Sequence, residues 1–187
     1  MPPPLPPSQL GFAFGPRPPI QVELFLDFVC PFSTKMWTTV VNEVLPKVGE
    51  KVTVVVHQVV QPWHPTGTMV HEVALAVKEA APTLYVAFVS KFCEEYAKGR
   101  FKDEDAWHKT RAQIYEELIE IATSVGVDSK LISPLVALKP EGGNAGNAMT
   151  QHVKVRRLPW RGEVPASQVG AARRSGPPST TGRAAST

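Results

Sequence analysis

The chain has 187 residues, and its hydrophobic content of 43% is sufficient for a folded core in one domain. Its net charge of +3 is unevenly distributed: residues 156–187 carry six arginines and one acidic residue, which leaves −2 for residues 1–155. A mildly acidic body argues against a nucleic-acid partner. No apolar stretch approaches the roughly 18 residues of a membrane span, so no membrane association is expected.

The N-terminal segment, residues 1–19, contains eight prolines and is expected to form an extended leader. Within it, only Leu10–Phe14 is predicted to dock against a sheet edge. The segment lacks the basic start and apolar centre of a secretory signal. The two cysteines, Cys30 and Cys93, lie in contexts that do not indicate a disulfide framework. We therefore expect a cytoplasmic location.

The sequence around Cys30 carries the strongest functional signal. An alternating apolar run, Val22–Val29, predicts a strand that leads into this cysteine, and apolar residues at helical spacing predict a helix from Ser33 to Val48. Pro31 is tolerated in the first helical turn, where a backbone N–H would have no helical partner. Because a helix N-terminus favours a thiolate over a thiol, we expect Cys30 to be reactive.

The chain after this helix predicts one more strand and then helices. The near-continuous apolar run Val52–Val60 is typical of a parallel strand covered on both faces, which gives a right-handed βαβ unit. Apolar spacing and glycine or proline punctuation then predict helical segments over residues 70–80, 83–98, 103–124, 131–138 and 143–155.

The segment Phe25–Ser33 (FLDFVCPFS) resembles the strand–Cys–Pro–x–x–helix pattern of the thioredoxin-like superfamily and, within it, of the DsbA-like branch. The resemblance covers about residues 20–155. It implies an α/β fold, a thioredoxin-like βαβ core with a helical insertion after the second strand, over about residues 68–138. Redox-active members carry a second cysteine where this chain has Ser33. The same segment is similar to kappa-class glutathione transferases and chromene-carboxylate isomerases.

The C-terminal residues 156–187 do not continue the pattern of these families. The resemblance implies a cis-proline loop, a β-hairpin and a final helix, but the segment consists mainly of Gly, Ala, Pro, Ser, Thr and Arg. So few large apolar residues cannot offset the entropy of ordering. We expect a domain over residues 20–155, a disordered basic tail over 156–187, and a fold without its C-terminal hairpin and helix.

The candidate site lies where the two predicted strands end. Parallel strands have their carboxyl ends on one side of a sheet, so the loop Pro62–Pro65 is expected near Cys30. Cys30 and Ser33 are the candidate chemical groups. The candidate substrate-binding residues are Pro31, Phe32, Trp63 and His64. The alternatives are a buried core thiol for Cys30, a helix cap for Ser33 and an ordinary proline-rich turn for the loop.

Other chemistry-bearing residues have structural interpretations. Cys93 is expected on the apolar face of a helix, and Trp107 is expected in the core along with Trp37. His64 and His71 have no obvious third ligand, so no metal site is predicted. No cofactor is predicted either, although glutathione is a candidate co-substrate.

Three functions fit these residues. The first is a thioredoxin-fold oxidoreductase-like protein whose single reactive cysteine exchanges thiols with glutathione or with client proteins. The second is a glutathione-dependent transferase or isomerase in which Cys30 or Ser33 positions the glutathione sulfur. The third is a non-catalytic binding module. The sequence predicts no oligomeric state.

Overall fold

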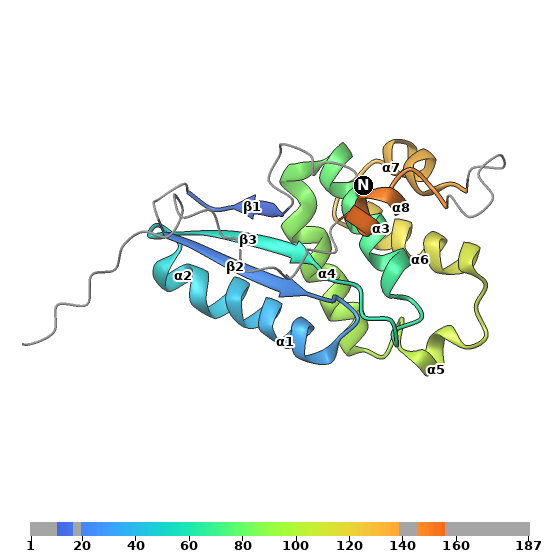
Figure 1. Ribbon diagram of the computed structural model, residues 1–187, viewed down its shortest axis with the longest axis horizontal. Coiled ribbons are helices and arrows are strands. Elements are labelled where there is room, and N and C mark those ends of the chain that lie inside the picture. Colours follow the sequence, from blue (N-terminus) through green and yellow to red (C-terminus); the bar gives the residue numbers. More distant parts are fainter. Residues whose placement is uncertain (1–10, 17–19, 139–145, 156–187) are drawn as a thin grey trace, which may run out of the picture.

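The computed structural model describes residues 11–16, 20–138 and 146–155 (Figure 1). In these residues the sheet has three strands in the order β1-β3-β2. The strands are β1 (Phe12–Phe14), β2 (Ile20–Leu26) and β3 (Val52–Gln58). β2 and β3 are parallel, and β1 is antiparallel to β3, which confirms the expected docking of this part of the leader. The expected tail and the absent hairpin concern residues 156–187, which lie outside the described residues.

A helical connection and a helical insertion complete the described chain. The connection between β2 and β3 comprises α1 (Pro31–Thr39), the π-helical η1 (Val40–Val44) and α2 (Leu45–Val48). The remaining elements are α3 (Gly67–Ala80), the 3₁₀ turn η2 (Pro82–Leu84), α4 (Tyr85–Ala97), α5 (Asp103–Ala106), α6 (Arg111–Ser124), α7 (Ser129–Val136) and α8 (Thr150–Val155). The helices α3–α7 form the predicted insertion and lie beside the carboxyl ends of β2 and β3 (Figure 1). None of the helices in the described ranges is long and apolar enough to cross a membrane.

Three predicted elements differ most from the structure. In the described residues, the helix predicted over residues 143–155 begins only at Thr150, because Asn147 Oδ1 accepts from the backbone N–H groups of Met149 and Thr150 and caps it there. β2 ends at Leu26 rather than at Val29, because the chain turns at Asp27. The helix predicted over residues 103–124 is divided into α5 and α6. The second helix starts at its own capping box, in which Thr110 and Gln113 each accept a hydrogen bond from the backbone N–H of the other. Trp107 lies in the connection between them and is 81% exposed, so its predicted place in the core is wrong.

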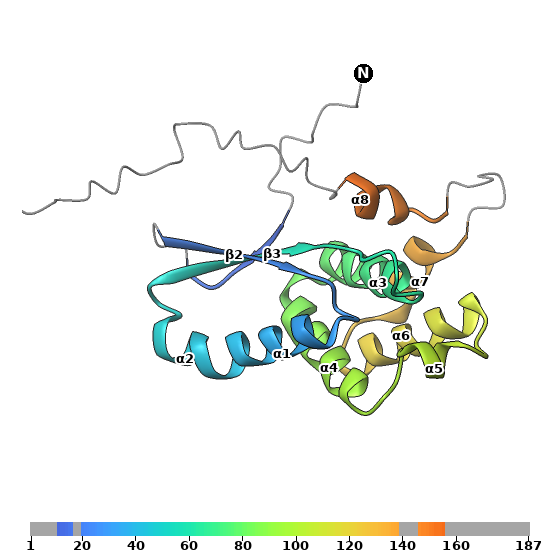
Figure 2. The ribbon, with the colours of Figure 1, turned by 60° about the horizontal axis from the view of Figure 1, so that its bottom comes forward.

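One face of the sheet is covered by α1 and α4 (Figure 2). The ring of Phe14 on β1 lies 5.8 Å from that of Trp37 on α1, and the Trp37 Nε1–H donates to Ser90 Oγ of α4 at 3.0 Å. In the strand register, Phe14 pairs with Val54 and Val54 with Val22. Since side chains at paired positions share a face, Val22 also points to the side of the sheet covered by α1 and α4.

The insertion is held together by a buried carboxylate on α3. Glu72 is 0% exposed and accepts hydrogen bonds from the Tyr115 hydroxyl of α6 and from Asn147 Nδ2, the latter at 2.9 Å. It also accepts one from the Thr150 hydroxyl of α8. Burial and the hydrogen bond to Glu72 raise the pKa of Tyr115 to about 12, so this hydroxyl stays protonated and keeps donating. The network therefore fastens the segment 146–155 onto α3.

Replacing Asn147 by alanine tests this connection. Asn147 Nδ2 also donates to Val136 O at 3.2 Å, so Asn147→Ala removes donors from Glu72 and from a buried carbonyl together. We expect the free energy of unfolding to fall by about 1–3 kcal/mol, the usual cost of leaving buried polar groups unpaired. Urea denaturation measures it. The exposed Asn42→Ala is the control and should change little; equal effects of the two substitutions would contradict the role of the network.

Candidate functional site

Cys30 is the N-cap residue of α1 and follows β2 after a short turn. Its backbone is extended, with φ −89° and ψ 126°, and Pro31 occupies the first turn of the helix. The Cys30 N–H donates to Asp27 O at 2.9 Å, and the Cys30 carbonyl accepts from Thr34 N at 2.9 Å. No side-chain cap satisfies the N-terminal amides of α1. A partly exposed sulfur at this position is therefore next to free N–H groups and the positive end of the helix dipole.

The candidate site residues that follow Cys30 in the sequence differ in their exposure to solvent. Phe32 is 80% exposed and Pro31 is exposed, whereas Ser33 is half-buried within the first turn. Cys93, by contrast, is 3% exposed on α4, and burial raises the pKa of its thiol to about 12. Cys93 is therefore held as a buried neutral thiol, whereas Cys30 is partly exposed to solvent.

A buried carboxylate at the end of β2 organises the surroundings of Cys30. Both oxygens of Asp27 accept hydrogen bonds: Oδ2 from Gln61 N and His64 Nδ1, each at 2.8 Å, and Oδ1 from Val29 N and His71 Nε2, each at 3.2 Å. Asp27 thus joins the end of β2 to the loop after β3 and to α3.

The pKa of Asp27 shows that this carboxylate is ionised. Burial alone would raise it, but the hydrogen bond and charge of His71, with the hydrogen bonds from His64 and Gln61, hold it below its usual value. An ionised carboxylate only accepts hydrogen bonds, so Nδ1 of His64 must carry a proton toward it. Nε2 of His71 contacts both Asp27 Oδ1, at 3.2 Å, and the Phe28 N–H, at 3.4 Å.

Tyr96 of α4 closes the side of this site. Its hydroxyl donates to Val29 O at 2.6 Å, next to Cys30. Burial and the negative charges of nearby groups, first among them Cys30, raise the pKa of Tyr96, so the phenol remains a donor. A hollow of about 190 Å³ lies between Val29, His64 and Tyr96, and it is bordered by the charged residues Lys102, Asp103 and Glu104.

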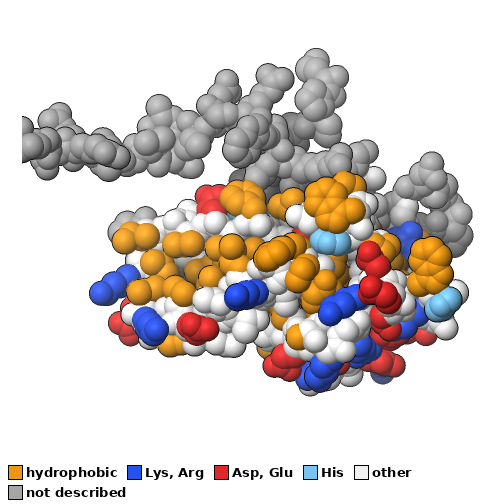
Figure 3. All heavy atoms as spheres, turned by 90° about the horizontal axis from the view of Figure 1, so that it is seen from below, with side chains coloured by type: hydrophobic (Ala, Val, Ile, Leu, Met, Phe, Trp, Pro, Cys, Tyr) orange, Lys and Arg blue, Asp and Glu red, His pale blue; other side chains and the backbone are white. Residues whose placement is uncertain are grey.

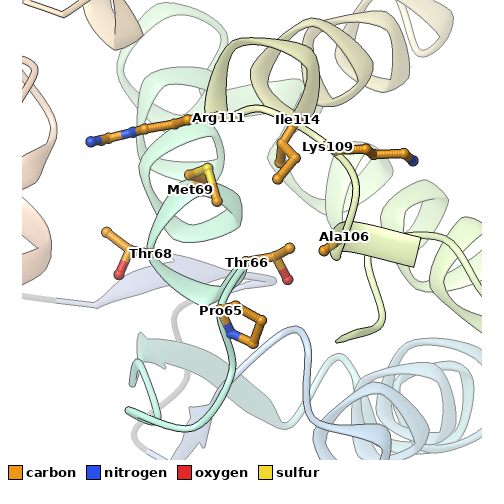
Figure 4. Close-up of a pocket in the computed structure, with 8 residues that line it drawn as sticks. All are labelled: Pro65, Thr66, Thr68, Met69, Ala106, Lys109, Arg111 and Ile114. Atoms are coloured by element: carbon orange, nitrogen blue, oxygen red, sulfur yellow. The ribbon is translucent and has the colours of Figure 1, made fainter. Parts of the chain in front are cut away.

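A second, larger cleft of about 420 Å³ adjoins this hollow at Thr66 (Figure 4). Its two cations already have partners: Lys109 Nζ lies 2.8 Å from Asp105 and 2.7 Å from Glu117, and Arg111 donates to Tyr115 and Glu72. Figure 4 shows both side chains extending away from the middle of the cleft. The cleft is lined by Pro65, Thr66, Thr68, Met69, Ala106, Lys109, Arg111 and Ile114.

The structure brings together the two predicted parts of the site. His64 lies at the Cys30 end of the sheet through its bond to Asp27, and Trp63 beside it is 66% exposed. The functional roles of these residues and of Cys30, Pro31, Phe32 and Ser33 remain predictions. Sequence reasoning missed Asp27, His71 and Tyr96. An acidic residue inside an apolar run was the available signal for Asp27, since a buried carboxylate needs several donors.

Metal binding has no support from this arrangement. Although His64 and His71 both reach Asp27, no group of three or more His, Cys, Asp or Glu side chains in the described part of the chain is arranged to hold a metal ion.

Comparisons with known proteins place the fold. No protein-family model matches the chain, and no match was found among curated proteins. A solved structure titled "putative protein-disulfide isomerase", from Pseudomonas syringae, is 21% identical, with a TM-score of 0.54 over 78% of this chain and 75% of that one. A periplasmic thioredoxin-like protein from Salmonella enterica serovar Typhimurium is 16% identical, with a TM-score of 0.41 over 66% of this chain and 76% of that one.

These comparisons correct one expectation. The similar structure whose title names a compartment is periplasmic, so the predicted cytoplasmic location is wrong on this finding. The physical reason is that two unpaired cysteines do not distinguish a reducing from an oxidising compartment. The fold itself is as predicted: the chain has a DsbA-like thioredoxin fold.

The bonds to Asp27 predict a specific response to acid. Because the pKa of Asp27 is lower in the folded than in the unfolded chain, its contribution to stability is complete above about pH 3.8 and is lost as the pH falls further. The variant Asp27→Asn should be less stable at neutral pH, and its difference from wild type should narrow below about pH 3.8. Urea denaturation across this range measures the difference. The exposed Asp128→Asn should behave like wild type, since asparagine also caps helices, whereas a pH-independent deficit in Asp27→Asn would contradict the assignment.

Proposed function

We propose that this protein exchanges thiols through one reactive cysteine, Cys30, forming mixed disulfides with glutathione or with a client protein. The observation that carries the proposal is the position of this sulfur as N-cap of α1, partly exposed, with Pro31 in the first turn and no other side chain capping the helix. Such a position favours the thiolate, which is the form that attacks a disulfide.

The proposed step is a single exchange. The Cys30 thiolate attacks one sulfur of oxidised glutathione, a new bond forms between Cys30 and that sulfur, and the glutathione disulfide breaks. The departing glutathione thiolate takes a proton from solvent. One disulfide replaces another, so there is no net oxidation. With Ser33 in place of a second cysteine, the mixed disulfide cannot be resolved within the motif.

The surroundings of Cys30 support a site for an extended thiol ligand. Phe32 and Trp63 present exposed aromatic surface, which suits contact with a peptide-like backbone. His64, oriented by Asp27, offers Nε2 as a polar contact near the hollow lined by Val29 and Tyr96. In the proposal these side chains bind and orient the ligand, and the sulfur of Cys30 performs the chemistry.

Mass spectrometry after incubation with oxidised glutathione tests the proposal. Wild type should gain one glutathione, and peptide mapping should place it on Cys30. Cys93→Ser should react as wild type does, because Cys93 is buried with a raised pKa, and Cys30→Ser should gain nothing. An adduct on Cys93, or none at all, would refute the exchange. Binding of reduced glutathione without any adduct would instead favour the transferase or isomerase alternative.

Restoring a second thiol gives a further prediction. In Ser33→Cys the new thiol lies one helical turn from Cys30, so after glutathione has been captured it can attack the Cys30 sulfur and release the second glutathione. The product should be an internal disulfide without bound glutathione, detected as a loss of two hydrogens in intact mass. Ser33→Ala is the matched control and should retain the adduct. A stable adduct in Ser33→Cys would show that the two positions do not meet.

A further inference from the structure

The strand β2 forms an edge of the sheet that remains apolar and exposed. Val22 points to the side of the sheet covered by α1 and α4, as does Ile20 two residues earlier, yet they are 39% and 57% exposed. They are exposed because, in the described residues, no strand lies beyond β2. The helices therefore do not reach this edge of the sheet, and apolar side chains stay exposed on a face that they otherwise cover.

The helical connection between β2 and β3 also carries exposed apolar side chains. Met36 of α1 is 49% exposed and Val44 of η1 is 40% exposed. Figure 3, which views the molecule from the side of α1 and α2, shows hydrophobic side chains gathered in a band along these elements. The β2 edge surface is here defined by Ile20 and Val22, which share one face of the strand.

Within the part of the chain that the structure describes, the outer backbone edge of β2 pairs with no strand. The sequence IQVELFL of Ile20–Leu26 contains no proline and no lysine, two residues that commonly protect an edge strand from pairing, and its one charged side chain is Glu23. All seven residues are paired with β3 on the inner side. The opposite edge of the sheet is different, because β1 has only three residues and is bounded by Gly11 and Gly15.

We propose that β2 pairs antiparallel with β2 of a second copy of this chain, about a two-fold axis at Val22. This register places Ile20 opposite the partner's Leu24 and Gln21 opposite the partner's Glu23. The amide of Gln21 can then donate to a carboxylate, whereas a register centred on Glu23 would oppose two carboxylates. Of these two registers, the charge pattern favours the one centred on Val22, in which Glu23 also keeps its contact with His57 of its own chain at 3.1 Å.

The two-fold arrangement also explains why association would stop at a dimer. A two-fold axis perpendicular to the sheet keeps α1 of both copies on the same side of the joined strands. Counting the described residues of both copies, the resulting sheet has six strands, with the short β1 strands at its outer edges. An isologous contact of this kind uses each long edge once and leaves none for a third copy. The paired residues, 20–24, do not include Cys30, so this inference does not depend on the thiol chemistry.

Molar mass in solution tests the dimer. Sedimentation equilibrium of the full chain over a range of concentrations should give a species of about twice the 20.4 kDa monomer. Val22→Lys should give a monomer, because it would place two ammonium groups opposite each other at the axis. Ala13→Lys, an exposed position on β1, is the matched control and should remain dimeric. Far-ultraviolet circular dichroism shows whether each variant is folded.

The register is tested separately at Gln21, which is exposed and outside the core. Gln21→Lys should tighten the dimer by about tenfold through two ion pairs with the partner's Glu23, and Gln21→Glu should weaken it by a similar factor. A monomer at every concentration, or open-ended aggregates without a discrete dimer, would overturn the proposal. Equal dissociation constants for the two Gln21 variants would overturn it as well.

Discussion

The described structure depends on one buried carboxylate. Asp27 is ionised inside the protein, and its two oxygens require donors from the turn after β2, the loop after β3 and the first half of α3. A buried charge without those donors would cost several kcal/mol, so the three segments must meet in one arrangement. The turn that contains Asp27 also delivers Cys30 to the start of α1, which links the electrostatics of the core to the geometry of the thiol.

The core around Cys30 could be predicted because local and long-range signals agree there. The alternating strand, the cysteine and Pro31 define a strand that leads into a helix, and the apolar run Val52–Val60 supplies the parallel partner. The DsbA-like resemblance supplied the helical insertion. These patterns depend on periodicity and on proline chemistry, both of which act within a few residues of the chain.

The rest of the site could not be predicted because it depends on pairs distant in sequence. His71 lies 44 residues from Asp27 and Tyr96 lies 67 from Val29, and nothing in their local sequence distinguishes them from ordinary helix residues. Trp107 was misplaced for a local reason, since the capping box at Thr110 starts a new helix and interrupts the apolar spacing. The partners of buried polar groups are set by the tertiary structure, so the periodicity of a single sequence does not reveal them.

The insertion supplies side chains that surround Cys30, and this limits which sequence changes in the insertion the fold can accommodate. His71 comes from α3 and Tyr96 from α4, so the helices between β3 and α8 are not a detachable module. A chain that shortened or exchanged this segment would leave Asp27 short of a donor and the Val29 carbonyl without its phenol. Grafting a foreign insertion onto the βαβ core would therefore require a replacement for each of these two contacts, and variation in the insertion would alter the wall of the hollow between Val29, His64 and Tyr96.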